Sequence, residues 1–572
     1  MDKLPPPRVP PTGSAPIRET SRVFRWRAEW LVLLALLVTL AGPFLLKPRE
    51  AASAAHYDRR LIILSPHNER VRREIGRAFT EDWQARTGET VYLDWRLPGG
   101  ASEIALFLKS EFAGAFQYYW ESGLHRPWNP TLAAGFADPR TDTSEPASIV
   151  AEARRIFLDS STGVGVDLLF GGGSYDFQQQ AEAGYLAPGS VAEGTGLAAI
   201  IAQHPGWFSP AGIPAEVSGE PFRDRENRWA GVVLASFGIV YNRDVLARLR
   251  IETEPAQWTD LADSRLAGQV ALADPSKSGS VAKAFELIIQ QQMHQAVARL
   301  TAEGTENAEA NGVREGWLAG LRLIQRISAN ARYFTDSASK IPLEVARGDA
   351  AAGMSIDSYG RAAEEYVRQP DGQSRVGFIA PMGGTSVNVD PIAMLRGAPE
   401  PELATAFMEF VLSTRGQKLW AFRPGTPEGP VAFALRRLPV RRDFYTPEHR
   451  RYMTDAAEQP FAKAQHFVYH PGWTGPVFGV IRFLIRVLCV DTHIEQRRAW
   501  RAMIDHGLPL DAVSAFHDLE GLGHDEVLAR IVPVLRARDK VAEVRLAREL
   551  GAVFRERYDR AFRLAKAQEG PS

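Results

Sequence analysis

Hydroxyl groups and backbone amides gather in the stretch "ADPSKSGS", residues 273–280, where a short apolar run gives way to a helical pattern. Two roles are open to Ser278 and Ser280. They are good N-cap residues, which would bond the first amides of the helix that follows. They are also suited to holding an anion, because the unpaired amides at a helix N-terminus carry partial positive charge. This stretch alone leaves both roles open.

Similar loops start near residues 65, 98, 171 and 357, and in each a β-rich run ends in small polar residues that open a helix. Turn formation and helix capping explain such residues equally well when each loop is taken alone. Their recurrence predicts a site built from loop amides and hydroxyls. The candidate ligand-binding residues are Ser65, His67, Asn68, Gly100, Ser102, Gly173, Ser174, Ser278, Gly279, Ser280, Asp357, Tyr359 and Thr385.

Asp357 and Tyr359 place a carboxylate and a phenol two residues apart, which suits a hard metal ion or a hydroxylated ligand. If a metal binds, these two residues are its candidate ligands, although Asp357 could instead cap the following helix. The sequence contains no G-x-S-x-G, H-E-x-x-H or G-x-x-x-x-G-K-[ST] motif. We therefore expect a binding protein that needs no cofactor, and not an enzyme.

The elements that must position these loops follow an α/β pattern. Val71, Ile75, Phe79 and Trp83 recur at helical spacing, and Gly88 is placed to end that helix. Alternating apolar residues then predict a strand at 91–95. Strands that alternate with helices indicate a mainly parallel sheet, and ligands of such sheets bind beyond the carboxyl ends of the strands.

Two regions depart from this pattern. Residues 111–160 are rich in aromatic residues and proline without a clean period, which is typical of an insertion or a lid. After about residue 445 the sequence is mostly helical. The run "GPVFGVIRFLIRVLCV", 475–490, is interrupted by Arg482 and Arg486 and is short for a membrane span, so it is expected to be a core or docking helix.

Composition limits the function. The chain has 572 residues, 45% hydrophobic and 24% charged, with a formal net charge of -1. These values are typical of a soluble globular protein of three or four units, and they give no support for a general nucleic-acid binder. Cys489 is the only cysteine, so an intrachain disulfide and a thiolate metal cluster are excluded.

The apolar run at residues 30–46 follows a cation-rich segment, which predicts a membrane helix with residues 1–29 in the cytoplasm. A cleaved signal peptide is the alternative, since "AASAA" at 51–55 offers small residues of the cleavage type. Charged residues between the apolar run and these alanines favour a retained anchor. Both interpretations place the body outside the inner membrane, in the periplasm or outside the cell.

A series of motifs resembles the extracellular solute-binding proteins of ABC importers, in the branch that binds ferric ion, thiamine, phosphonates and sugar phosphates. The motifs are "LSPHNERVRREIGRAF", "GGASEI", "VDLLFGGGSYDFQQQAEAGYLAP", "WAGVVLASFGIVYNRDVL", "WTDLADSRLAGQVALADPSKSGS", "AAGMSIDSYG", "APMGGTSVNVDPIAMLRGAP" and "ATAFMEFVLSTRGQKLW", between about residues 60 and 445.

The resemblance implies a type II periplasmic-binding-protein fold, in which two α/β lobes joined by crossing strands close over a ligand by a hinge motion. Lobe 1 would comprise residues 57–236 and 378–445, with the insertion at 111–160, and lobe 2 residues 237–377; residues 446–572 would be a helical extension. The strands would cross near "LASFGIVYN" and "VGFIAPMGGT". Residues 278–280 would then hold an anion opposite the loops of lobe 1, and ABC permease subunits would be the partners.

The sequence departs from this family in two ways. Ferric binders of the branch use adjacent tyrosines, whereas this sequence offers only Tyr359 at that position. We therefore expect a phosphorylated or carboxylated metabolite as the ligand, with ferric ion as the alternative. The anchor, the insertion and the helical extension are not usual family parts, which leaves open a tethered transport receptor or a receptor or scaffold that signals to a partner.

Overall fold

The structure of this chain is a computed structural model that describes residues 57–189, 194–537 and 539–567, together with Leu34, Leu36, Leu37 and Thr39. These four residues are helical, but the rest of the expected anchor at 30–46 and the alanines of 51–55 lie outside the described residues. Residues Arg59–Ser572 form one compact unit.

The first βαβ segment follows the sequence pattern closely. Helix α2 (Glu69–Thr87) begins where the Asn68 side chain accepts a hydrogen bond from the Val71 amide, and it ends at Gly88, whose φ of 80° lies in the left-handed region that favours glycine. Its apolar stripe packs against the parallel strands β1 (Arg59–Leu64) and β2 (Val91–Arg96). The predicted helix and strand are therefore confirmed.

The half of the molecule that contains these elements is called lobe 1. Its sheet has the strand order β2-β1-β3-β11-β6, in which the first three strands are parallel and β11 is antiparallel to both of its neighbours. The further strands are β3 (Leu168–Phe170), β11 (Val387–Met394) and β12 (Leu438–Pro439), with a small hairpin β4 (Glu216–Val217) and β5 (Glu220–Pro221). The further helices are α3 (Ala101–Tyr118), α4 (Pro130–Gly135), α5 (Ile149–Asp159), α6 (Ser174–Ala183), α7 (Gly196–Gln203), α13 (Pro401–Leu412) and α14 (Thr414–Ala421).

Strand β6 (Trp229–Asn242) connects lobe 1 to the second half, called lobe 2. Its first part pairs with β11 and its second part pairs with β9 and β10, so one strand belongs to both sections of the sheet. The chain returns to lobe 1 between β10 and β11. The strands of lobe 2 are β7 (Val270–Ala273), β8 (Ala331–Thr335), β9 (Ala352–Ile356) and β10 (Val376–Ile379), and its helices are α8 (Arg243–Arg248), α9 (Gly279–Ala302), α10 (Ala308–Ala329), α11 (Ile341–Arg347) and α12 (Asp357–Tyr366).

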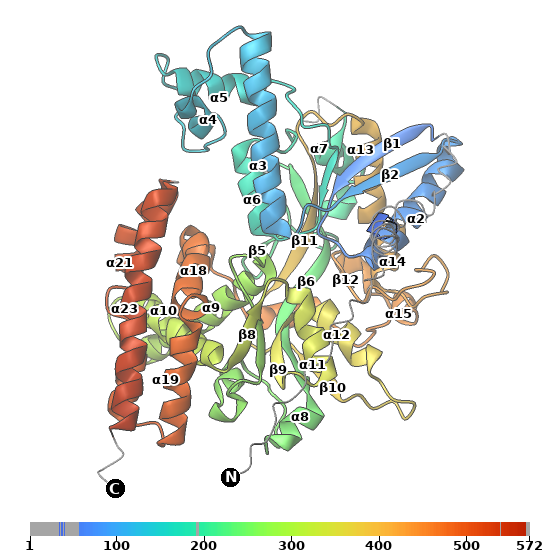
Figure 1. Cartoon of the computed structure of the whole chain (residues 1–572). Helices are drawn as coiled ribbons and strands as arrows, with labels where there is room; N and C mark the ends of the chain where they lie inside the picture. Colours follow the sequence, from blue (N-terminus) through green and yellow to red (C-terminus); the bar gives the residue numbers. More distant parts are fainter. Residues whose placement is uncertain are drawn as a thin grey trace, which may run out of the picture. The chain divides into compact units, whose positions relative to one another are not determined.

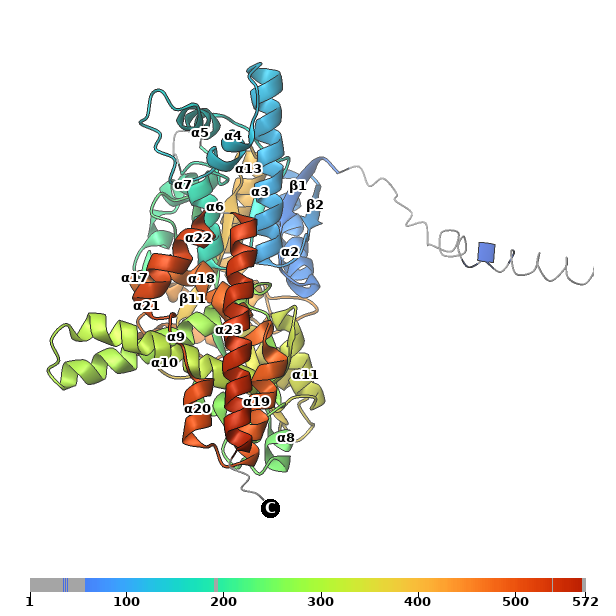
Figure 2. The same ribbon diagram turned by 60° about the vertical axis from the view of Figure 1, so that its left-hand side comes forward.

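The C-terminal part is helical, as predicted, and its helices α18, α19 and α23 lie beside α9 and α10 of lobe 2 (Figure 1, Figure 2). We call residues 446–572 the extension. Its helices are α15 (Pro447–Arg450), α16 (Pro460–Lys463), α17 (Pro471–Thr474), α18 (Phe478–Ile485), α19 (His493–Asp505), α20 (Leu510–Phe516), α21 (His524–Glu526), α22 (Val532–Arg536) and α23 (Lys540–Lys566).

Two hydrophobic cores hold the body together. One core belongs to lobe 1, and the other combines lobe 2 with the extension from Phe467 onward. The helical run Pro471–Val490 has a mean hydropathy of 1.6, enough by length and composition to cross a membrane, but 61% of it is buried in the protein. Val480, Ile481 and Leu484 of this run pack in the second core, so it is a core helix, as expected.

The aromatic segment at 111–160 is more regular than the sequence pattern indicated. Helix α3 continues through its first residues as far as Tyr118, and Phe112 and Phe116 lie one turn apart on the buried side of this helix. Phe116 packs against Phe136 and Phe157, with ring centroids 4.9 and 5.2 Å away. The short helices α4 and α5 close this aromatic cluster against α3 (Figure 1), and they are too short to give a clear period in the sequence.

Candidate functional site

A cleft of about 780 Å³ lies between the two lobes, where several helices of both lobes begin. Most of the residues that the sequence singled out line it. They are His67, Asn68, Gly100, Gly173 and Ser174 of lobe 1, and Ser278, Gly279, Ser280 and Tyr359 of lobe 2. The structure therefore brings together loops that are up to about 290 positions apart in the sequence, because the carboxyl ends of their strands meet at the crossing strand β6.

Backbone amides at two helix starts face this cleft without a side-chain cap. Helices α3 and α6 have Gly100 and Gly173 as N-cap residues, and in the described part of the chain neither start receives a capping bond from a side chain at that position. Glycine has no side chain that could accept from the first amides of the helix. The Gly173 amide itself donates to the Asp176 carboxylate, so the amides that follow in each first turn are the ones left for an oxygen atom of a ligand.

Two further helix starts at the cleft, those of α2 and α9, carry side-chain caps. Asn68 Oδ1 accepts from the Val71 amide at 3.2 Å, and Ser278 Oγ accepts from the Val281 amide at the longer distance of 3.4 Å. Ser278 is buried, whereas the neighbouring Ser280 is half-buried and lies in the first turn of α9. Ser278 thus caps helix α9, which is one of the two roles that the sequence left open. Ser280 lines the cleft.

His67 is a neutral side chain at the floor of the cleft. Its ring packs edge-on against Phe170, with centroids 4.7 Å apart, and Nε2 is buried without a hydrogen-bond partner among the described residues. Burial, with smaller contributions from Arg437 and Arg72, lowers the pKa of His67 to about 3. The imidazole therefore carries no charge at neutral pH.

Tyr359 and Asn68 connect the lobes across the cleft. Tyr359 lies in the first turn of α12 in lobe 2, and Asn68 caps α2 in lobe 1. Burial raises the pKa of the Tyr359 phenol, and the hydrogen bond with Asn68 partly opposes that rise. The phenol is therefore protonated at neutral pH, which makes it a hydrogen-bond donor and not an anionic ligand.

Buried Arg437 forms an ion pair with half-buried Asp390 at the cleft. Arg437 Nη2 donates to Asp390 Oδ2 at 2.6 Å, and Arg437 Nε is buried without a partner in the part of the chain that the structure describes. Burial acts to lower the pKa of Arg437, but the carboxylates of Asp390 and Asp357 more than offset it, so the pKa is raised. The pair supplies one unused charged donor at the site.

Side-chain charges around the cleft are balanced. The cations are Lys277, Lys283, Lys340 and Arg437, and the carboxylates are Glu103, Asp176, Asp336 and Asp390. Asp176 lies at the start of α6, with Oδ2 3.5 Å from the position that a Cβ of Gly279 would take. Burial raises the pKa of Asp176, and Arg482 opposes the rise. The cleft thus combines amide donors with carboxylate acceptors.

Four predicted site residues do not line the cleft, and three of them are bonded inside the protein. Ser65 Oγ accepts from the His67 amide at 3.1 Å, and Ser102 Oγ accepts from Arg482 Nη2 at 2.5 Å. Thr385 Oγ1 accepts from the Phe237 amide at 3.2 Å and so connects the two crossing segments. The sequence analysis predicted these residues from their positions in the loops, and a loop position does not determine the direction in which a side chain points.

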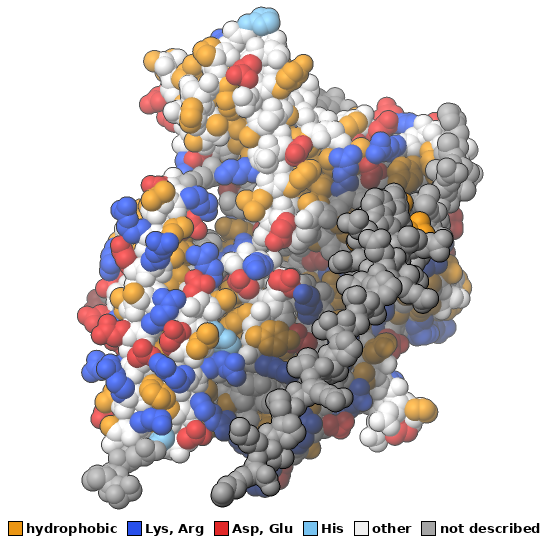
Figure 3. Space-filling view, viewed as in Figure 1, with side chains coloured by type: hydrophobic (Ala, Val, Ile, Leu, Met, Phe, Trp, Pro, Cys, Tyr) orange, Lys and Arg blue, Asp and Glu red, His pale blue; other side chains and the backbone are white. Residues whose placement is uncertain are grey.

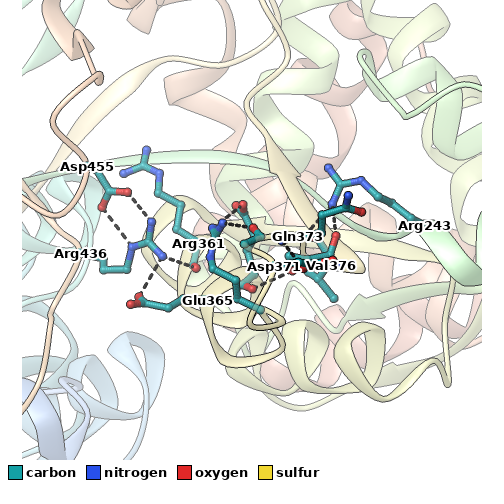
Figure 4. A network of polar contacts seen from close by, with 12 residues as sticks. Arg243, Arg361, Glu365, Asp371, Gln373, Val376, Arg436 and Asp455 are labelled. Atoms are coloured by element: carbon teal, nitrogen blue, oxygen red, sulfur yellow. Dashed lines mark hydrogen bonds and ion pairs between the residues drawn. The ribbon is translucent and has the colours of Figure 1, made fainter.

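Asp357 lies on the opposite side of the crossing strands from Tyr359. It lines a second pocket of about 640 Å³ together with Arg361, Arg436 and Asp455, and its Oδ2 accepts from Arg361 Nη2 at 3.1 Å. In this region Arg436 is held between Asp455 and Glu365 (Figure 4). The structure therefore separates the carboxylate and the phenol that the sequence placed at one site.

Several cleft residues had no sequence signal. Asp176 and Asp390 are single carboxylates in apolar or helical stretches, and Arg437 is one of two consecutive arginines before the strand β12. Phe478 comes from the extension, about 120–200 positions after the lining residues of lobe 2. Only their shared position at the cleft identifies them.

No group of three or more His, Cys, Asp or Glu side chains in the described residues is arranged to hold a metal ion. Over the face on which α23 lies, Lys and Arg side chains alternate with Asp and Glu side chains (Figure 3). The mixed surface agrees with the balanced composition and gives no large basic patch on this face.

Part of the chain matches the model of a known family. Residues 158–432 match the family of bacterial extracellular solute-binding proteins, a range that includes the starts of α6, α9 and α12. The phosphoglycerate transport regulatory protein PgtC of Salmonella typhimurium is 24% identical over 201 residues, 35% of this chain and 42% of PgtC. The chain covers less than half the length of the curated relatives that it matches.

Two solved structures are similar at the level of the chain trace. The periplasmic binding protein AfuA from Actinobacillus pleuropneumoniae, with exogenous fructose-6-phosphate bound, is 17% identical; the match covers 63% of this chain and 81% of AfuA, with a TM-score of 0.40. Iron-bound HitA from Pseudomonas aeruginosa is 16% identical, and the match covers 74% of this chain and 98% of HitA, with a TM-score of 0.40.

Proposed function

Because residues 158–432 belong to the bacterial extracellular solute-binding protein family, we propose that this protein captures a small hydroxylated organic anion, such as a phosphorylated or carboxylated metabolite, between its lobes. The observation that carries the proposal is the pair of helix starts at Gly100 and Gly173, whose first amides face the cleft without a side-chain cap. Such amides bind phosphate or carboxylate oxygens. The acceptors Glu103 and Asp176 beside them suit hydroxyl groups on the same solute.

Ferric ion is the less favourable ligand within this proposal. A hard trivalent ion needs several anionic oxygen ligands, and burial raises the pKa of Tyr359, the one tyrosine at the predicted position, so this phenol is harder to deprotonate than an exposed tyrosine. A cleft of about 780 Å³ is also far larger than a bare ion requires and fits an organic solute.

The protein would act as a type II receptor whose lobes close over the solute and present it to the permease subunits of an ABC importer. A second function, sensing, is favoured by one observation: the extension contacts both lobes beside the cleft, through Arg482. Affinity capture from membranes separates the two, because a transport receptor should retain permease and ATPase subunits and a sensor should retain a kinase or a cyclase.

Binding can be tested with 3-phosphoglycerate and fructose 6-phosphate as probes. We expect a phosphorylated or carboxylated solute to raise the melting temperature by mass action. Replacing both Ser278 and Ser280 by alanine should weaken that binding about one hundredfold or more, since each bond to a charged group contributes about 1.5–3 kcal/mol. Loss of the Ser278 cap should lower the free energy of unfolding by only about 1 kcal/mol.

Ser276→Ala is the matched control in the same loop, because Ser276 Oγ donates to Asp274 at 2.7 Å and does not line the cleft. Its affinity should equal that of the wild type. Tight binding of ferric ion without an organic anion would contradict the ligand class, and an unchanged affinity in the Ser278 and Ser280 double variant would leave these serines with a structural role alone.

We further propose that residues 30–46 anchor the protein in the inner membrane, with the body on the outer side. The positive charges before this apolar run support that orientation. Full-length protein should remain in the membrane fraction after a carbonate wash and keep its N-terminus, whereas a chain that begins at residue 57 should be released. A soluble product of the full-length gene that begins near His56 would contradict retention.

A further inference from the structure

One arginine of the extension bonds both lobes beside the cleft. Arg482 of α18 donates from Nη2 to Ser102 Oγ at 2.5 Å and to the Ser276 carbonyl at 3.1 Å, and from Nε to the Pro275 carbonyl at 2.9 Å. Ser102 is in the first turn of α3 in lobe 1, and the two carbonyls belong to the loop before α9 in lobe 2. A change in the distance between these two helix starts would break some of these bonds.

A buried polar cluster makes a second connection of the same three parts. The Lys283 ammonium of lobe 2 lies 3.0 Å from Glu220 of lobe 1 and 2.9 Å from Glu286. From the extension, the Tyr469 hydroxyl donates to Glu286 Oε1 at 2.8 Å, and the Tyr469 ring lies 3.5 Å from the ammonium. Both carboxylates are buried, so separating the partners would leave charged groups unpaired in an apolar environment.

Aromatic packing adds a third contact at the same end of the cleft. Phe478 of the extension lines the cleft, and its ring centroid lies 4.5 Å from that of Tyr175 in the first turn of α6. The extension therefore touches lobe 1 through Ser102 and Tyr175 and lobe 2 through the loop before α9, in addition to sharing the core of lobe 2.

We propose that the extension is a clamp that holds the two lobes together beside the cleft, and that Arg482 is the positioning residue that sets the separation of the α3 and α9 starts. The distance between the two lobes then depends on the extension as well as on the hinge and the solute. The consequence for solute binding rests on the proposed function, because α3 and α9 carry the amides and hydroxyls assigned to the anion. A clamp of this kind would favour solutes that fit a cleft of one width.

The test measures the distance between the lobes in the absence of any solute. Nitroxide labels are placed on cysteines that replace the exposed residues Ala85 of α2 and Arg347 of α11, one on each lobe. Native Cys489 is fully buried, and burial raises the pKa of its thiol to about 11, so it does not compete for the label. Pulsed electron paramagnetic resonance then reports the distribution of the distance between the labels.

We expect a narrow distribution in the otherwise wild-type protein and, in Arg482→Ala, a shift to longer distances that exceeds the wild-type width. Arg486→Ala is the control, because Arg486 lies one turn later in the same helical run and bonds neither lobe 1 nor the loop before α9 among the described residues. Its distribution should superimpose on that of the wild type.

Ser102→Ala keeps the test decisive if Arg482→Ala does not fold, because it removes only the hydroxyl that accepts from Arg482 and alanine is favoured in a helix. It should lengthen the distance in the same direction. Wild-type distributions in the foldable variants would overturn the clamp. Failure of 3-phosphoglycerate or fructose 6-phosphate to bind would count against the proposed function alone, because the distances are measured without solute.

Discussion

The imidazole of His67 ionises at a much lower pH in the folded protein than in an unfolded chain. It is 6% exposed, packs against Phe170 and Trp420, and has a pKa of about 3. The cause is burial first, and the nearby arginines second. Below the ordinary histidine pKa of about 6.5, the unfolded chain therefore binds a proton that the folded protein does not.

Stability should consequently fall as the pH falls from about 6.5 toward about 3, because a histidine with a depressed folded pKa favours the unfolded state in that window. For His67 alone, the loss between pH 7.5 and pH 5 is about 2 kcal/mol. The variant His67→Gln lacks this titrating group. Its free energy of unfolding should therefore fall by about 2 kcal/mol less than that of the wild type between pH 7.5 and pH 5. Urea unfolding at the two pH values measures both drops.

His125→Gln is the control for this measurement, because it makes the same replacement at an exposed position. Buried His493 and His517, whose pKa values are lowered to about 4, contribute equally to all three proteins. A pH dependence of His67→Gln that matches the wild type would contradict the neutral, buried state assigned to His67.

Single residues also show the limit of prediction from the sequence. The small polar residues after each strand predicted most of the cleft, because chain topology alone brings the carboxyl ends of neighbouring strands together. Asp357 and Tyr359 were predicted at one site but line different pockets, since side chains two residues apart on a helix point in nearly opposite directions. The sequence pattern left open whether these residues were in a loop or in a helix, and the first turn of α12 decides it.

At the scale of elements, the pair of helices α9 and α10 depends on glycine. The two helices lie side by side and extend away from the body together (Figure 2). Gly312, Gly316 and Gly320 face α9, and a Cβ on Gly316 would lie 2.2 Å from the Cα of Met293. The spacing of four residues keeps all three on one face of α10, so the backbones can approach closely.

Gly316→Ala should therefore destabilise the protein, because the added methyl group meets backbone atoms that a side-chain rotation does not relieve. The expected loss is about 1–3 kcal/mol, as for other overpacked cores. Gly114→Ala is the matched control: Gly114 is exposed on α3 with nothing within 4 Å of the added Cβ, so it should be neutral or stabilise by up to about 1 kcal/mol. Equal melting temperatures for the two variants would contradict the close packing.

Elements with a strong local signal were predicted correctly. The helix at 69–87 has an apolar stripe, a cap at its start and Gly88 at its end, so three independent features agree. In the segment 111–160, Phe112 and Phe116 also have helical spacing, but the short helices after them and the prolines between them hide it. A period needs several turns before it is visible in a sequence.

At the scale of the whole molecule, the extension could be recognised as helical, but its partner could not. An amphipathic stripe shows that a helix packs against something without identifying the other surface. In the structure the extension completes the core of lobe 2: Trp317 Nε1 donates to the Leu522 carbonyl at 2.8 Å, and Trp500 Nε1 donates to Asn330 Oδ1 at 2.7 Å. These bonds are buried and join residues that are about 170–205 positions apart.

Removing the extension should therefore disrupt lobe 2 and not merely shorten the chain. A protein of residues 57–445 would expose the apolar faces of α9 and α10 and leave the indole N–H of Trp317 and the Oδ1 atom of Asn330 without the hydrogen-bond partners that the extension supplies. We expect it to aggregate or to bind a hydrophobic dye with loss of cooperative unfolding, whereas a protein of residues 57–567 should melt in one sharp transition. A soluble 57–445 protein with the same melting temperature would show that lobe 2 folds without the extension. The shared core predicts the opposite result, because burial of apolar surface is the main source of the stability of a folded lobe.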